Sequence, residues 1–181
     1  EEVTGGDGDA IIPLKAASEV RRLLDGDELM TIKLGEKQCS FEASNFVLTT
    51  KLIEGNYPNY RQVVPASFAR AVEIPSSVFL GKIETVSLVL SDSSSYIILR
   101  FEDNELTLQA SSTEVGEGSD KVEVVFEGEP FEVSFNPAFL ADPLRTCDAE
   151  KVRMKFNDSM SPVAIEGNEG FLYVIMPIRK K

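Results

Sequence analysis

The sequence predicts an α+β fold in which a β-α-β-β-β unit occurs three times and paired helices pack against antiparallel sheets. Three segments share one pattern: a short β-type run, then a proline, then a helical pattern. The prolines are 62 residues apart in both intervals (75 − 13 and 137 − 75), at Pro13, Pro75 and Pro137. A constant spacing of this kind indicates an internal structural repeat. After each helical pattern, apolar residues alternate with polar ones, as is typical of half-buried strands.

Each proline opens an amphipathic helix of the predicted repeat. Proline suits the first turn of a helix, where its missing N–H group leaves no hydrogen bond unmade. Apolar residues then recur at helical spacing and form one stripe that faces a core. The stripes consist of Ala16, Val20, Leu23 and Leu24, of Phe79, Ile83 and Val86, and of Leu140, Leu144 and Cys147. Pro143 lies inside the third helix and is expected to kink or shorten it.

A hairpin and one further strand complete each unit. The hairpins are predicted at residues 29–43, 96–110 and 151–165, and the last strands at 45–50, 121–127 and 171–176. One unit has too little surface to bury by itself, whereas two units can bury their helices against two sheets.

This reasoning divides the chain into an acidic tail, a half-domain and a complete domain. They span residues 1–9, 10–68 and 69–181, and the sequence EGNYPNYRQVVPASF, with Pro58 and Pro65, connects the last two.

Composition excludes several classes of protein. The chain has no histidine, which removes Ser-His-Asp and Cys-His catalysis and most transition-metal sites. We therefore expect no cofactor and no metal. Cys39 and Cys147 lie within apolar patterns and are expected to be buried free thiols, which favours a reducing cytoplasm. The net charge is −12, and no apolar run approaches the length of a membrane helix.

Four stretches, in this order, resemble the bacterial DNA sliding clamp family, the β subunit of the DNA polymerase III holoenzyme. They are TTKLIEGNYPNYRQVVP, EGEPFEVSFNPAFLADPLR, VRMKFNDSMSPVAI and the terminal YVIMPIR. The resemblance extends from residue 10 to the end of the chain. It implies the DNA-clamp fold, in which six repeats form three domains and two chains close head-to-tail into a ring around duplex DNA. Helices line the hole, and sheets form the outer wall.

By this resemblance the chain is a fragment of a processivity factor without catalytic residues. It corresponds to the second half of domain two and the whole of domain three. The implied DNA-facing residues on the helices are Lys15, Arg21, Arg22, Lys82 and Arg145. The implied contribution to the dimer interface lies at the end of the second helix, around Val86, Val89 and Leu90, with the neighbouring strands of the second repeat.

The resemblance also implies a pocket for short peptides of polymerase subunits, the clamp loader and repair proteins, typically a Gln followed by Leu and Phe. The matching positions are Pro58, Val63, Asn136, Phe139, Met160, Val174, Met176, Pro177, Ile178 and Arg179. Three departures from the family occur. Phe139 stands where the family often has tyrosine, Gln62 replaces a basic residue, and SDSSSY replaces a charged loop, which leaves Ser94 and Ser95 unassigned.

Two other classes of protein stay open on the residues alone. An enzyme could use a pair of carboxylates, for which the clusters are DGDE at 25–28 and EDNE at 102–105. These clusters lie in predicted turns, where acidic residues are common. A structural or assembly protein unrelated to DNA could also contain such repeats. Three further repeats upstream of Glu1 would distinguish the clamp from both.

Overall fold

The computed structural model describes residues 5–6, 8–24, 29–90 and 96–179. The chain forms two compact units, Glu1–Asn59 and Tyr60–Lys181. The division falls within the predicted connector, before the expected boundary after residue 68.

The first unit contains one helix and one three-stranded sheet. Helix α1 spans Leu14–Leu23, and the strands are β1 (Thr31–Leu34), β2 (Gln38–Glu42) and β3 (Val47–Lys51), in the order β1-β2-β3. The core consists of Val20, Cys39 and Phe41 with partly buried apolar neighbours. The expected helix and hairpin are therefore present, with a small core between them.

One predicted core strand of this unit is only partly covered. Ile32 and Leu34 of β1 lie opposite Phe41 and Cys39 of β2, so they share the apolar face of the sheet. They are nevertheless 56% and 45% exposed, whereas Phe41 and Cys39 are buried. Within this unit, the described residues cover Ile32 and Leu34 only in part, with Gly8 against the Leu34 side chain.

The second unit contains two complete repeats. The first consists of β4 (Arg70–Pro75), α2 (Ser76–Ser87), β5 (Ile97–Glu102), β6 (Glu105–Ser112) and β7 (Gly116–Glu123). The second consists of β8 (Phe131–Phe135), α3 (Pro137–Thr146), β9 (Lys151–Phe156), β10 (Val163–Glu166) and β11 (Leu172–Ile175). A short 3₁₀ turn, Tyr60–Gln62, precedes them.

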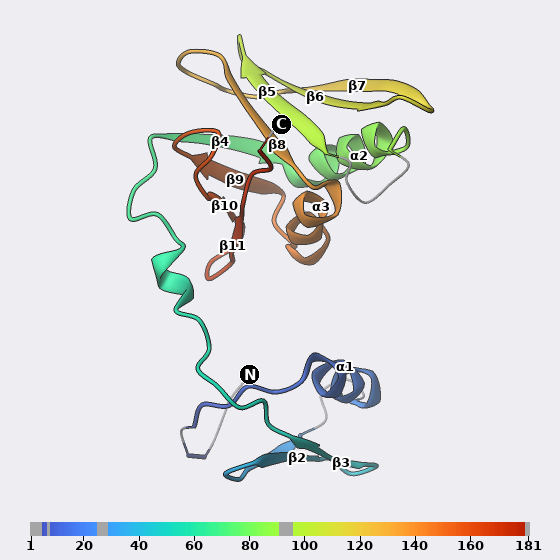
Figure 1. Ribbon diagram of the computed structural model, residues 1–181, viewed down its shortest axis with the longest axis vertical. Coiled ribbons are helices and arrows are strands. Elements are labelled where there is room, and N and C mark those ends of the chain that lie inside the picture. The colour runs from blue at the N-terminus through green and yellow to red at the C-terminus, as the bar shows by residue number, and fades with distance from the viewer. Residues whose placement is uncertain (1–4, 7, 25–28, 91–95, 180–181) are drawn as a thin grey trace. The chain divides into compact units, whose positions relative to one another are not determined.

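The two repeats exchange their first strands. One sheet has the order β11-β10-β9-β4 and the other β7-β6-β5-β8, so β4 and β8 each join the sheet of the other repeat (Figure 1). In the first sheet Arg70 lies opposite Phe156, and in the second Phe131 lies opposite Phe101. Each sheet therefore draws on both repeats.

Helices α2 and α3 pack against each other beneath these sheets and bury the predicted stripes (Figure 1). The six stripe residues that were predicted for the two helices are at most 8% exposed. An aromatic cluster of Phe101, Phe126, Phe131 and Phe156 fills the space between the sheets, and the rings of Phe131 and Phe156 stack at 4.5 Å. In the described part of the chain, no helix has the length and apolar character needed to cross a membrane.

The repeated prolines occupy two different helix positions. Pro13 and Pro75 are the residues just before α1 and α2, whereas Pro137 is the first residue of α3. Asn136 therefore takes the cap position of α3, and its side chain accepts a hydrogen bond of 2.9 Å from the Ala138 N–H group. Helix α3 continues three residues beyond Pro143, so this proline does not end it.

Candidate peptide-binding surface

The strand register brings two of the expected pocket segments to one end of a sheet. Strand β11 is an edge strand, and its last residue, Ile175, lies opposite Val163, the first residue of β10. The residues after β11, beginning with Met176, are therefore adjacent to the loop before β10, which carries Met160.

The connector reaches the same end of the sheet through Asn157. The Asn157 side chain accepts a hydrogen bond of 2.7 Å from the Ala69 N–H group and donates one of 3.0 Å to the Ser67 carbonyl. Val63, another expected pocket residue, lies four residues before Ser67. The side-chain amide thus ties the start of β4 to the loop of Met160.

The terminal segment then crosses to the other sheet. The Ile178 N–H group donates a hydrogen bond of 2.7 Å to the carbonyl of Ser134 in β8, and Ser134 is buried. Asn136 and Phe139 follow β8 directly, at the start of α3 (Figure 1). One hydrogen bond therefore joins the end of the chain to the strand that positions these two residues.

Four apolar residues of these segments are exposed. Phe139, Met160, Met176 and Val63 are between 47% and 57% exposed. Exposed apolar side chains that cluster at one place commonly mark an interaction site. Val174, Pro177 and Ile178 are half-buried beside them, and Arg179 is exposed.

Two expected parts of the pocket are not joined to this cluster. Pro58 is exposed and belongs to the first compact unit, so it is described with that unit alone. Ser94 and Ser95 lie outside the described residues.

Sequence reasoning missed the residue that shapes the loop of Met160. The Asp158 carboxylate accepts hydrogen bonds of 2.8 Å from the N–H groups of Met160 and Ser161, and one of 2.6 Å from the Ser161 hydroxyl. The Ser161 hydroxyl bond, with the Met160 bond, lowers the pKa of Asp158 below its usual value. The run Asn-Asp-Ser-Met-Ser carries the signal for this turn, since an aspartate commonly bonds the N–H group two residues on.

The expected DNA-facing cations differ in their surroundings. Lys82 pairs with Asp120 at 2.8 Å, Arg145 pairs with Glu84 at 3.0 Å, and Arg22 pairs with Glu19. Lys15 and Arg21 have no ion pair among the described residues and are exposed. Only α1 has more cations than acids, because in α2 and α3 one acid accompanies each cation.

The expected interface residues differ in exposure. Val86 faces the core and is 1% exposed, as its place in the second helix stripe predicts, so its side chain offers no exposed surface to the interface that the resemblance implied. Val89 and Leu90 are partly buried against the same core, whereas Leu88 is 81% exposed. The end of α2 adjoins β7, where a Cβ atom on Gly118 would lie 3.3 Å from the Val86 carbonyl oxygen.

Among the residues that the structure describes, no three His, Cys, Asp or Glu residues could hold a metal ion. The EDNE cluster forms the turn between β5 and β6, and Asp103 and Asn104 have positive φ there. The DGDE cluster lies outside the described residues. Cys39 and Cys147 are free and buried as predicted, and burial raises the pKa of Cys39.

The paired repeats define the class of DNA clamps. Two family models match the chain: the central domain of the DNA polymerase III beta subunit over residues 1–59, and its C-terminal domain over residues 61–179. The chain therefore belongs to the DNA polymerase III beta subunit family.

Relatives and solved structures agree with this assignment. The beta sliding clamps of Chlamydia muridarum and Escherichia coli K12 are 34% and 28% identical, over 95% and 93% of this chain and 47% of each relative. Crystal structures of the clamps of Caulobacter crescentus and Pseudomonas aeruginosa have TM-scores of 0.87 and 0.88, at 29% and 27% identity. Each match covers 94% of this chain, with 46% and 48% of the other chain. The chain thus spans about half the length of the relatives that it matches.

Proposed function

We propose that the chain is part of a sliding clamp, the processivity factor of a bacterial replicative DNA polymerase. The observation that carries the proposal is the exposed apolar cluster at the end of β11, within a domain of the DNA polymerase III beta subunit family. The intact protein would encircle duplex DNA in the cytoplasm and tether polymerase subunits. It would act without catalytic residues of its own.

In this proposal the first unit is the second half of clamp domain two, and residues 69–181 are clamp domain three. The partly covered face of β1 supports the proposal, since Ile32 and Leu34 would be buried by the other half of domain two. Two intact chains would close head-to-tail. Strand β7, an edge strand beside the end of α2, would supply the domain-three side of that interface.

We further propose that the cluster binds the short peptides by which polymerases, the clamp loader and repair proteins reach the clamp. An extended peptide can place its apolar anchors against Met176, Phe139 and Met160, while main-chain groups fix its register. Methionine side chains adapt to different anchors, which suits a surface with several partners. Val63 from the connector would complete the part of the pocket that the second unit supplies.

The test is an NMR titration of the chain with a capped peptide that contains Gln followed by Leu and Phe. We expect saturable shifts at Met176, Ile178 and Val63, and weaker binding than in an intact clamp, which has the rest of domain two. A peptide with Leu and Phe replaced by alanine is the control and should produce no shifts. Shifts confined to residues away from the end of β11 would contradict the proposed pocket.

DNA binding by this chain should be very weak. An intact clamp retains DNA because the ring encloses the duplex, not because it binds the phosphates tightly. In this chain the few cations on the helices must attract DNA although the net charge of −12 repels it. In a gel shift with linear duplex DNA at about 150 mM salt, we expect no retarded band. At low salt, replacing Lys15 and Arg21 by alanine should remove the residual binding, whereas replacing Lys82, which is paired with Asp120, should change it less. Tight, salt-resistant binding would contradict this account.

A further inference from the structure

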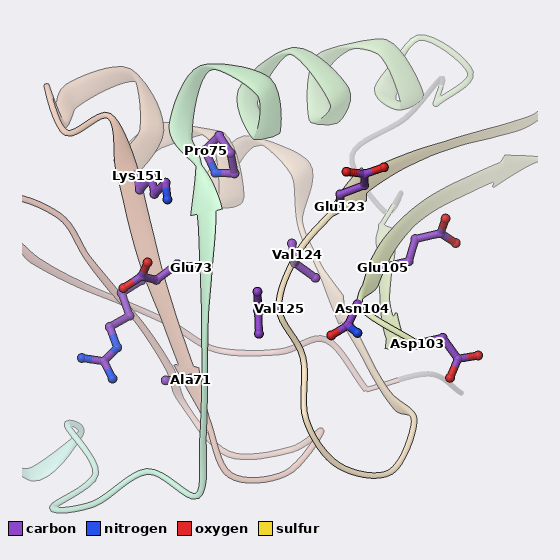
Figure 2. A pocket seen from close by; sticks show the side chains of 11 residues that line it. Ala71, Glu73, Pro75, Asp103, Asn104, Glu105, Glu123, Val124, Val125 and Lys151 are labelled. Carbon is purple, nitrogen blue, oxygen red and sulfur yellow. The ribbon is translucent and has the colours of Figure 1, made fainter.

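A hollow lies on the outer face of the sheets in the second unit, separate from the peptide-binding surface. Its volume is about 960 Å³, within the usual range of ligand pockets. Strand β4 forms one side, and the turn between β5 and β6 forms the other with the residues that follow β7 (Figure 2). We call it the β4 groove. It shares no residue with the cluster at the end of β11.

The β4 groove contains a free strand edge. Strand β4 pairs with β9 on one side, and no described strand pairs with its other side. The Ser76 N–H group donates to the Glu150 carbonyl and continues this ladder in register. Because hydrogen-bonded and non-bonded positions alternate along an antiparallel strand, the main-chain groups of Ala71 and Glu73 point to the free edge. Both residues line the groove.

The same unit shows what such an edge can accept. The corresponding edge of β8 is occupied, because the Ile178 N–H group bonds the Ser134 carbonyl. Ser134 lies two residues before the cap of α3, as Glu73 does before the cap of α2. In the first repeat, Phe126 has the position that Ile178 has in the second. Phe126 follows the end of the edge strand β7 by three residues, and Ile178 follows the end of the edge strand β11 by three residues.

Phe126 does not occupy the edge of β4. Its N–H group donates instead to the Asn104 side chain at 2.9 Å, and the Val124 N–H group donates to the Asn104 carbonyl at 3.0 Å. Asn104 thus holds this segment against the β5–β6 turn. The C-terminal segment covers the edge of β8 through Ile178. No described segment covers the corresponding edge of β4 in this way.

The wall opposite β4 is acidic, whereas Lys151 and Arg153 of β9 line the groove on the side of β4, where Arg153 lies opposite Glu73. Glu105 and Glu123 lie directly across from each other in β6 and β7, a like-charge pair that is unfavourable without a cation. Lys121 pairs with Glu105 at 2.8 Å, and Asp103 adds a third carboxylate to this wall. The side chain of Val125, 77% exposed, lies between its own segment and β4 (Figure 2).

We propose that the β4 groove binds an extended, basic segment of a partner protein, which adds to β4 as a further strand. Main-chain groups of Ala71 and Glu73 bond the segment, as Ser134 bonds Ile178. Its basic side chains face Glu105, Glu123 and Asp103, and an apolar side chain contacts Val125. A sheet edge with an acidic facing wall selects for such a segment against an acidic one.

A capped hexapeptide that alternates lysine and valine is the probe. We expect saturable NMR shifts of the Ala71 and Glu73 amides and of the Val125 methyl groups at about 30 mM ionic strength. A hexapeptide that alternates glutamate and valine should bind at least about tenfold more weakly. The Glu123→Lys variant should weaken binding of the basic peptide by at least about tenfold.

The matched control is Glu117→Lys, which makes the same charge change near the far end of β7. It should alter affinity less than about twofold. The proposal is overturned if Glu117→Lys weakens binding as much as Glu123→Lys, or if no saturable shift occurs below about 5 mM peptide. It is also overturned if the same amides shift with protein concentration alone, because a second copy of the chain would then occupy the groove.

Discussion

Replacing Phe156 with alanine should lower the free energy of unfolding of the second unit by about 3–5 kcal/mol. The Phe156 side chain is fully buried, stacks on Phe131 and lies 5.2 Å from the ring of Phe101. Its removal would leave a cavity between the two sheets, because both sheets fix the surrounding side chains. Urea denaturation followed by circular dichroism would measure the change.

Phe139→Ala is the matched control, since it removes the same side chain from an exposed position. Phe139 is 57% exposed at the start of α3, so we expect a change below about 1 kcal/mol. If the two variants lose equal stability, the aromatic cluster is not the centre of the core.

Replacing Met176 with aspartate should weaken binding of the Gln-Leu-Phe peptide by at least about 100-fold, or 2.7 kcal/mol. Peptide binding would remove the new carboxylate from water without giving it a partner. Arg179 is the nearest cation in sequence. The NMR titration described above measures the effect, and the free energy of unfolding should change little because Met176 is 55% exposed.

Leu172→Asp provides the comparison. Leu172 is 48% exposed at the start of β11, whereas Met176 follows the end of this strand; Leu172 lies opposite Glu166, at the other end of the β10–β11 ladder. The peptide should bind this variant as it binds the original chain. Equal loss in both variants would point to a general disruption of β11 and contradict a role for Met176 in the pocket.

The local elements of the fold and the hairpins could be predicted from the sequence, but the exchange of β4 and β8 between the two sheets could not. The spacing of Phe79, Ile83 and Val86 defines a helix stripe by itself, because helical period is a local property. The exchange of β4 and β8 depends on which edges meet in three dimensions. For the same reason, the contact of Gly118 in β7 with Val86 at the end of α2 could not be predicted from the sequence.

The candidate site divides in the same way. The resemblance supplied Met160, Met176 and Phe139. The register of β10 and β11 brings the segments of Met160 and Met176 together, and the Ile178–Ser134 hydrogen bond joins the terminal segment to β8, which precedes Phe139. The Asp158 turn could have been found from local sequence. The Lys82–Asp120 pair and the β4 groove could not, because an ion pair across 38 positions and a free edge both follow from sheet order.

The exchanged strands also constrain the order in which the chain can fold during synthesis. Strand β4 pairs with β9, so Arg70 cannot take its place in the ladder until Phe156, 86 positions later (156 − 70), has been synthesised. Strand β5 likewise lacks one neighbour until β8 has left the ribosome. Neither repeat can complete its sheet alone, so residues 70–175 should fold late and as one cooperative block. A nascent chain that stalls before residue 150 would keep its apolar strands available to chaperones.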